Sequence, residues 1–269
     1  MSGVRKDGFL RNHDSAILCA RVCRLFLITF LVLMAGTSTS SAQAAAPVIP
    51  YYARTNTFSV FGAYSGDSSH IFMGDAENRK LLDFGVAYGR KLVLNRIVNW
   101  QYNGELLPVA LESDPVVHTV INLTSPVTVT FIENATQPDA CVAQSGIYTV
   151  NTYQGPEIGT IAVSCTRRWT IGEGISPVGF QWNFLPRQKL QPFFIGHGGY
   201  MYSSQPIPVY DAGSFNFTFD LGAGFELYRS NTKSIRAEYR YHHISNHNTA
   251  NTNPGIDSGL FQLTYSFGR

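Results

Sequence analysis

The sequence predicts an all-β chain that forms an eight-stranded antiparallel transmembrane β-barrel of the outer-membrane type. Eight segments alternate between apolar or aromatic and polar side chains, as strands with two different faces do. The connections between them are alternately short and long, as are the periplasmic turns and extracellular loops of outer-membrane barrels. An apolar run near the N-terminus indicates export.

The N-terminal residues 1–44 are interpreted as a secretory signal peptide. Two arginines precede an apolar run from Leu25 to Ala35, and an Ala-Gln-Ala triplet ends at Ala44. This order of basic, apolar and small residues is that of a cleavable signal. The alternative is a membrane anchor, but the run is short for a membrane span. Residues 45–269 are then expected to form the barrel.

The composition fits an exported barrel and argues against some partners. The chain has 24 glycines, 13% aromatic residues and only 14% charged residues. Its formal net charge of +2 is small, which argues against a nucleic-acid partner. Beyond the N-terminal run, no apolar stretch of the sequence is long enough for a transmembrane helix.

Period-two alternation gives the approximate position of each strand. The expected strands are 58–64, 81–89, 96–107, 177–185, 190–202, 215–228, 234–246 and 257–267. A soluble barrel of the lipocalin type would show the same alternation with its aromatic face turned inward. The signal peptide and the unequal connections favour the membrane barrel.

The segment 108–176 is too long for an ordinary loop. It contains alternating runs of its own, and we interpret it as an extracellular hairpin or lid outside the barrel wall. It also holds both cysteines that remain after export, Cys141 and Cys165. Because exported chains meet an oxidising environment, these two are expected to form a disulfide.

The strand 234–246 has one aromatic and one charged face. Arg236, Glu238 and Arg240 share a face with His242, and in a membrane barrel that face lines the lumen. Unpaired charges in a narrow lumen would be costly. Partners are therefore expected among acids that also face inward; the candidates are Asp83, Asp220 and Glu226.

The opposite, apolar face of the same strand carries His243 and Ser245. Residues two apart on a strand point the same way and lie about 6.6 Å apart along the chain. Asp257 opens the next strand, and hairpin pairing would place it beside His243. A serine, a base and a carboxylate are the parts of a nucleophilic hydrolase. We expect Ser245 as nucleophile, His243 as base and Asp257 as the acid that orients it.

The remaining parts of this site follow from the same placement. Asn246 or nearby backbone amides are expected to donate to the oxyanion. A site on the lipid-facing wall indicates a membrane lipid as substrate.

Two alternatives stay open: a His-x-Ser pair is common and can be without function, and His242, His243 and His247 could suggest a metal site. No ligand spacing supports a metal, so neither metal nor cofactor is expected.

Residues 238–246, 253–257 and the aromatic C-terminal strand resemble the lipid A 3-O-deacylase family of outer-membrane acyloxyacyl hydrolases. Residues 181–187 and 215–218 extend the resemblance. It implies an eight-stranded barrel that hydrolyses the ester-linked acyl chain at position 3 of lipid A on its lipid-facing surface. It also implies His243 as base, Ser245 as nucleophile and Asn246 as the oxyanion neighbour.

The acid departs from the family pattern, because the family's glutamate falls on Asp257. On this resemblance, a glutamate at 257 is expected to keep or raise activity. The chain is expected to be integral to the bacterial outer membrane, with lipid A of the lipopolysaccharide as its partner. An esterase or phospholipase for other lipids and a structural barrel without catalysis are the alternatives. A homodimer is left open.

Overall fold

The computed structural model describes residues 51–123, 129–153 and 155–269, so the predicted signal peptide 1–44 lies outside the described residues. Within the described part there is no helix, and hence none long and apolar enough to cross a membrane. The strands are β1 (Asn56–Ser65), β2 (Lys80–Leu94), β3 (Val98–Leu123), β4 (Val129–Thr136), β5 (Gln144–Thr152), β6 (Gly155–Phe184), β7 (Leu190–Ser203), β8 (Phe215–Ser230), β9 (Lys233–Ser245) and β10 (Ile256–Gly268).

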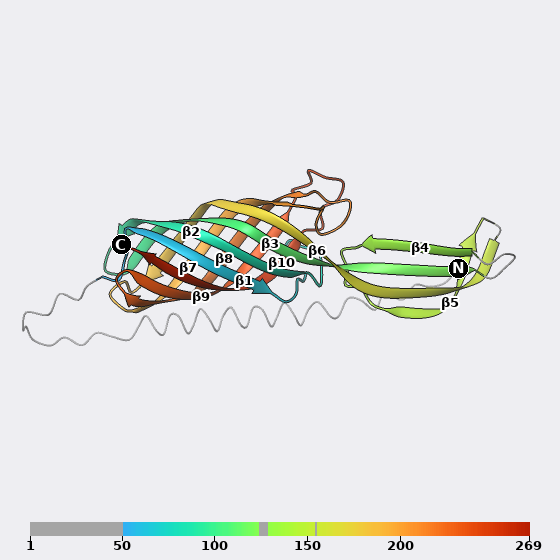
Figure 1. Cartoon of the computed structure of the whole chain (residues 1–269), viewed down its shortest axis with the longest axis horizontal. Coiled ribbons are helices and arrows are strands. Elements are labelled where there is room, and N and C mark those ends of the chain that lie inside the picture. The colour runs from blue at the N-terminus through green and yellow to red at the C-terminus, as the bar shows by residue number, and fades with distance from the viewer. Residues whose placement is uncertain (1–50, 124–128, 154) are drawn as a thin grey trace, which may run out of the picture. The chain divides into compact units, whose positions relative to one another are not determined.

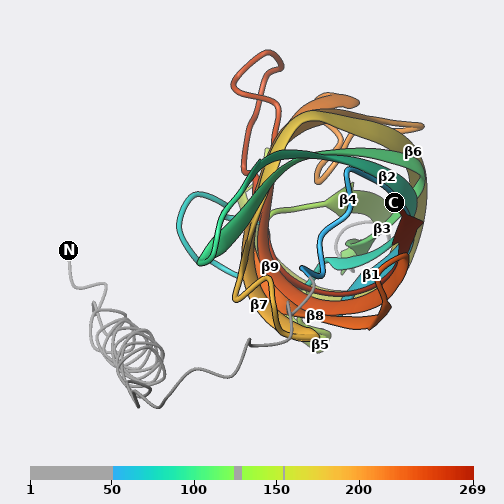
Figure 2. The same cartoon turned by 90° about the vertical axis from the view of Figure 1, so that its left-hand side faces the viewer.

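Eight of these strands close into an antiparallel ring in the order β1-β2-β3-β6-β7-β8-β9-β10, with β10 paired back to β1 (Figures 1 and 2). Closure leaves the wall without a free edge, so every wall strand has hydrogen-bonded neighbours on both sides. Five of the eight strands include the whole segment that period-two alternation indicated, and β3, β6 and β9 include theirs except for one or two terminal residues. The predicted fold class is confirmed.

The two faces of the wall differ as a membrane barrel requires. In β10 the aromatic and aliphatic side chains of Phe261, Leu263, Tyr265 and Phe267 are exposed, while the polar residues between them are buried. The same alternation runs along β8 and β9. The lipocalin alternative, with the aromatic face inward, is therefore wrong. An apolar exterior and a polar interior are what a lipid-facing wall needs.

The lumen is filled by a polar network. Arg236, Glu238 and Arg240 are buried there, as predicted. Arg240 pairs with Glu105 and Glu238, each at 2.7 Å, and Arg236 donates to the side-chain oxygen of Gln181.

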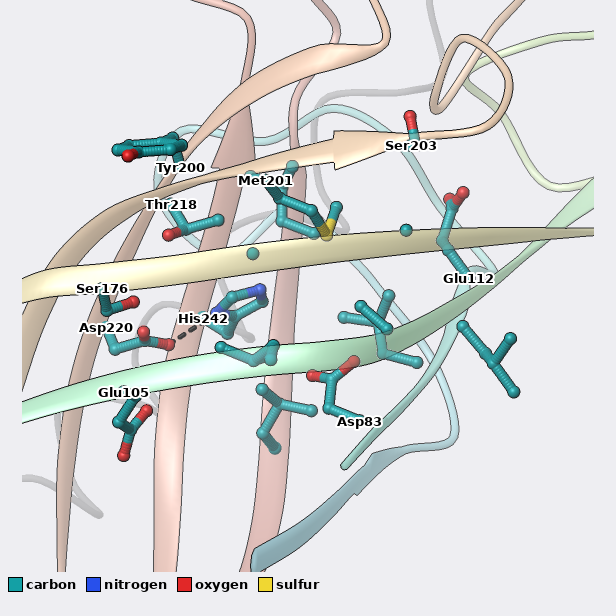
Figure 3. Close-up of a pocket in the computed structure, with 18 of the residues that line it drawn as sticks. Asp83, Glu105, Glu112, Ser176, Tyr200, Met201, Ser203, Thr218, Asp220 and His242 are labelled. Carbon is teal, nitrogen blue, oxygen red and sulfur yellow. Dashed lines mark hydrogen bonds and ion pairs between the residues drawn. The ribbon is translucent and has the colours of Figure 1, made fainter. Parts of the chain in front are cut away.

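The prediction of which acids would pair with Arg236 and Arg240 was wrong. Glu226 pairs at 2.6 Å with Arg54, which lies in the segment before β1. Asp220 pairs with His242 at 2.5 Å. Alternation gives the face of a side chain, but it does not tell which wall strand lies across the lumen. Figure 3 shows Asp220 and His242 pointing toward one another at a small cavity of about 30 Å³, room for only one or two waters.

β3 and β6 continue beyond the ring and remain paired as far as Leu123↔Gly159. β4 and β5 flank them, which gives a four-stranded sheet in the order β4-β3-β6-β5 (Figure 1). The predicted disulfide between Cys141 and Cys165 is present, with an S–S distance of 2.02 Å. It ties the segment that precedes β5 to β6.

The two ends of the segment 108–176 lie in the wall instead of outside it. β3 stays paired with β2 as far as Ser113↔Lys80, and β6 is paired with β7 from Gly172↔Ser203 onward. A register shift between Leu107 and Ala110, where the sequence has a proline, interrupts the alternation. The predicted strand therefore ended at this bulge, whereas β3 continues through it to Leu123.

Candidate active site

The hairpin of β9 and β10 brings the predicted base and the predicted acid together. Asp257 is the direct cross-strand partner of His243. The imidazole Nδ1 of His243 lies 2.7 Å from Oδ1 of Asp257. Both residues belong to the outward-pointing set of their strands, together with Tyr239, whose side chain is 63% exposed. His243 and Asp257 therefore meet on the outer surface of the barrel, as the spacing predicted.

Ser245 lies two residues further along β9 and lines the same surface groove as His243. This groove has a volume of about 390 Å³, and Met73, Phe217 and Phe219 complete most of its wall. The Ser245 hydroxyl oxygen makes no hydrogen bond to His243 in the described part of the chain. Such contacts are often loose before substrate binds, and Nε2 of His243 is the ring atom that Asp257 leaves unused.

Two groups of the β9–β10 loop donate to the Ser245 oxygen. The side-chain amide Nδ2 of Asn253 lies 3.2 Å from it, and the backbone N–H of His247 lies 3.1 Å away. His247 has a positive φ of 52°, which turns this part of the loop back toward the serine. Two hydrogen-bond donors thus converge on the Ser245 hydroxyl at the edge of the groove.

Asn246 has a different place. Its side chain is buried, with Nδ2 donating to the carbonyl of Thr252 at 2.7 Å and Oδ1 accepting from the N–H of Asn248 at 2.9 Å. Its backbone N–H donates to Oδ1 of Asn253 at 3.0 Å. Adjacent residues of an extended chain point to opposite sides, so Asn246 turns away from Ser245. It fixes the loop and, through it, the amide of Asn253.

Asp257 is fully covered although it lies on the outer side of the wall. Its Oδ1 accepts from His243 and from the Tyr241 hydroxyl at 2.8 Å. Its Oδ2 accepts from the backbone N–H groups of Phe72 and Met73 at 2.6 and 2.8 Å. The cover is the loop after β1, which no pattern in the sequence linked to the tail.

The three histidines of the tail do not converge. His242 points into the lumen toward Asp220, His243 points outward, and the ring of His247 lies against Phe217 with 6.2 Å between centroids. Among the described residues, no group of three or more histidines, cysteines or acids is arranged to hold a metal ion.

Residues 144–266 match the family described as lipid A 3-O-deacylase (PagL). This range includes the outward-facing cluster of His243, Ser245, Asn253 and Asp257. The resemblance stated from the sequence is therefore confirmed over the range 144–266. No curated protein matches the chain.

Several solved structures of outer-membrane proteins are similar to this chain. The outer-membrane enzyme PagL is 12% identical with a TM-score of 0.41, covering 80% of this chain and 99% of that one. Neisserial surface protein A is 10% identical with a TM-score of 0.42, covering 80% and 97%. OprG from Pseudomonas aeruginosa is 9% identical with a TM-score of 0.34, covering 80% and 98%.

Proposed function

We propose that this integral outer-membrane barrel, whose residues 144–266 match the lipid A 3-O-deacylase family, is a carboxylic ester hydrolase that removes the acyl chain at position 3 of lipid A. The observation that supports it most is the 2.7 Å contact between His243 and Asp257, beside Ser245 on the outer surface. A lipid in the outer leaflet reaches such a site by lateral diffusion, without leaving the membrane.

The reaction follows from the position of each group. Ser245 Oγ attacks the ester carbonyl carbon while Nε2 of His243 takes its proton. The bond to the sugar oxygen then breaks, and His243 returns the proton to the leaving hydroxyl. Water, activated by the same histidine, releases the fatty acid from the serine. Asp257 holds Nδ1–H of the ring and stabilises the imidazolium that forms in both steps.

For the oxyanion we assign the donors to Asn253 Nδ2 and the backbone N–H of His247. Both already lie within hydrogen-bond distance of the Ser245 oxygen, at 3.2 and 3.1 Å. Asn246, the residue expected from the sequence, acts one step further away, because its backbone N–H fixes Asn253. The apolar wall of Met73, Phe217 and Phe219 suits the acyl chain.

The direct test is mass spectrometry of lipid A from cells that express the chain, beside cells that express Ser245→Ala. The wild-type protein should remove one ester-linked acyl chain per lipid A, and the variant should leave it intact. Both must be present in the outer membrane in equal amounts. Unchanged lipid A with loss of acyl chains from phospholipids would favour the phospholipase alternative, and no loss from either lipid would favour a structural barrel.

Asn253→Ala should lower kcat by about 10²- to 10³-fold, the usual cost of removing one oxyanion donor. KM should change little, because the donor acts on charge that develops after binding. The assay is release of fatty acid by the purified barrel in detergent. Thr252→Ala is the control, since the hydrogen bonds of this neighbouring residue to Asn246 and Asp211 use its backbone and stay in place. Equal activity of Asn253→Ala and the wild type would assign the oxyanion to other donors.

A further inference from the structure

The loop after β1, residues 66–79, is held against the active site along its length. Its backbone N–H groups at Ser69, Asp75 and Ala76 donate to the carbonyls of Asp257, Pro254 and Gly255, at 3.1, 2.6 and 3.0 Å. These acceptors lie at the start of β10 and just before it. The loop therefore follows the same short segment that carries the acid.

A buried arginine anchors the far end of this loop. Arg79 is fully buried, and its guanidinium donates to the carbonyls of Glu77, Gln137 and Pro138 at 2.5 to 2.6 Å. It also contacts Asp114 of β3 at 3.3 Å. Hydrogen bonds with a charged donor of this kind are stronger than those between neutral groups. The loop is thus fixed at two places. One is Asp257, and the other is the start of the four-stranded sheet, where Arg79 contacts β3 and the residues that follow β4.

The tip of the loop has a side-chain arrangement unlike that of an ordinary polar turn. Phe72 and Met73 are 77% and 57% exposed, and the Phe72 ring packs edge-on against Tyr241 with 5.4 Å between centroids. Met73 also lines the groove that holds His243 and Ser245. The same two residues give Asp257 its two backbone donors.

We propose that Phe72 and Met73 form a clamp, in which their backbone amides position Asp257 for His243 while the Met73 side chain limits the length of acyl chain that the groove accepts. This rests on the proposed esterase function and names a part of the site outside the β9–β10 tail. Phe72 and Met73 are positioning residues, because their amides act on the imidazole only through Asp257. Without them, Oδ2 of Asp257 would lose the two short hydrogen bonds that it accepts from the loop, at 2.6 and 2.8 Å.

Gly74 gives a matched pair of variants to test the clamp. A Cβ at Gly74 would lie 2.5 Å from the Asp257 nitrogen and 3.0 Å from its Cγ, so Gly74→Ala must push the loop away from the acid. A Cβ at Gly66, in the same loop, would meet nothing nearer than the Tyr64 hydroxyl at 3.4 Å. Gly66→Ala is therefore the control, with the same chemical change in the same loop.

We expect Gly74→Ala to lower kcat by about 10- to 100-fold, the range for losing hydrogen bonds to a charged group, with KM nearly unchanged. Met73→Pro, which removes one donor N–H, should act in the same way. Met73→Ala keeps the N–H but removes the side chain from the groove wall, so it should shift the preference among esters toward longer acyl chains. The measurement is steady-state hydrolysis of an ester series by the full chain, with folding checked by circular dichroism.

A double-mutant cycle separates positioning from general damage to the fold. In an Asp257→Ala background, Gly74→Ala should cause no further loss, because the clamp has no carboxylate left to hold. Additive losses would overturn the proposal, as would full kcat in Gly74→Ala or a rise in KM alone. An inactive wild type would instead overturn the esterase function itself, so the two failures are distinguishable.

Discussion

Ser245→Ala and His243→Ala should each lower the rate of deacylation by about 10⁴-fold or more, and the double variant should lose no more than either single one. Nucleophile and base act as one unit, so removing either removes the covalent route and their effects do not add. Both side chains line an open surface groove and carry no part of the lumen network. The folded barrel should therefore survive both changes.

The measurement is release of fatty acid from purified lipid A in mixed micelles. Ser204→Ala, at an exposed serine that directly follows β7, is the matched control and should keep the wild-type rate. A Ser245→Ala protein with full activity would overturn the serine mechanism. A His243→Ala protein with full activity would assign the base to another group.

The wall of the barrel was predictable because every ring strand has one face toward the lumen and one away from it. Period-two alternation records that contrast directly, even in the short β1. It fails where backbone geometry changes, as at the bulge between Leu107 and Ala110. It also does not report pairing outside the ring, and β4 and β5, at the edges of the four-stranded sheet, were not predicted as separate strands.

The chemistry of the site was predictable only as far as local geometry reaches. His243 and Ser245 share a face by spacing, and Asp257 meets His243 by hairpin register. Two backbone donors to Asp257 come from Phe72 and Met73, about 185 residues earlier in the chain, and no local pattern reports such a contact. Arg54, which forms an ion pair with Glu226, lies outside every strand and gave no periodic signal.

The role of Asn246 shows a different limit. Adjacency to Ser245 in the sequence favoured it as the oxyanion donor, but adjacency on an extended chain places it on the opposite face. Asn253 belongs to the segment that resembles the family, yet its approach to Ser245 depends on how the loop between β9 and β10 folds. That fold is fixed by hydrogen bonds among the asparagines themselves.

Asp257→Glu should lower kcat by about 10-fold or more, which revises the expectation from the sequence that a glutamate would serve as well. The aspartate carboxylate already has four donors at 2.6 to 2.8 Å, from His243, Tyr241, Phe72 and Met73. An added methylene would push the carboxylate into these donors, and the covering loop has little room to retreat, because Gly74 already packs on Asp257. The orientation of His243 should suffer with it.

Asp257→Asn should cost more, about 10²- to 10⁴-fold in kcat, in line with the loss seen when such an acid becomes an amide. An amide keeps the size of the side chain but turns one acceptor into a donor, which then faces either the N–H of His243 or the clamp amides. The rate of Asp257→Ala should lie closer to that of the wild type than the rate of Asp257→Asn does, because an empty space leaves the imidazole free to keep its working tautomer.

Rates for the three variants, measured on folded protein at one pH, decide the order. Wild-type activity in Asp257→Glu would show that the loop yields and that the family's glutamate fits here after all, whereas wild-type activity in Asp257→Asn would remove Asp257 from the mechanism.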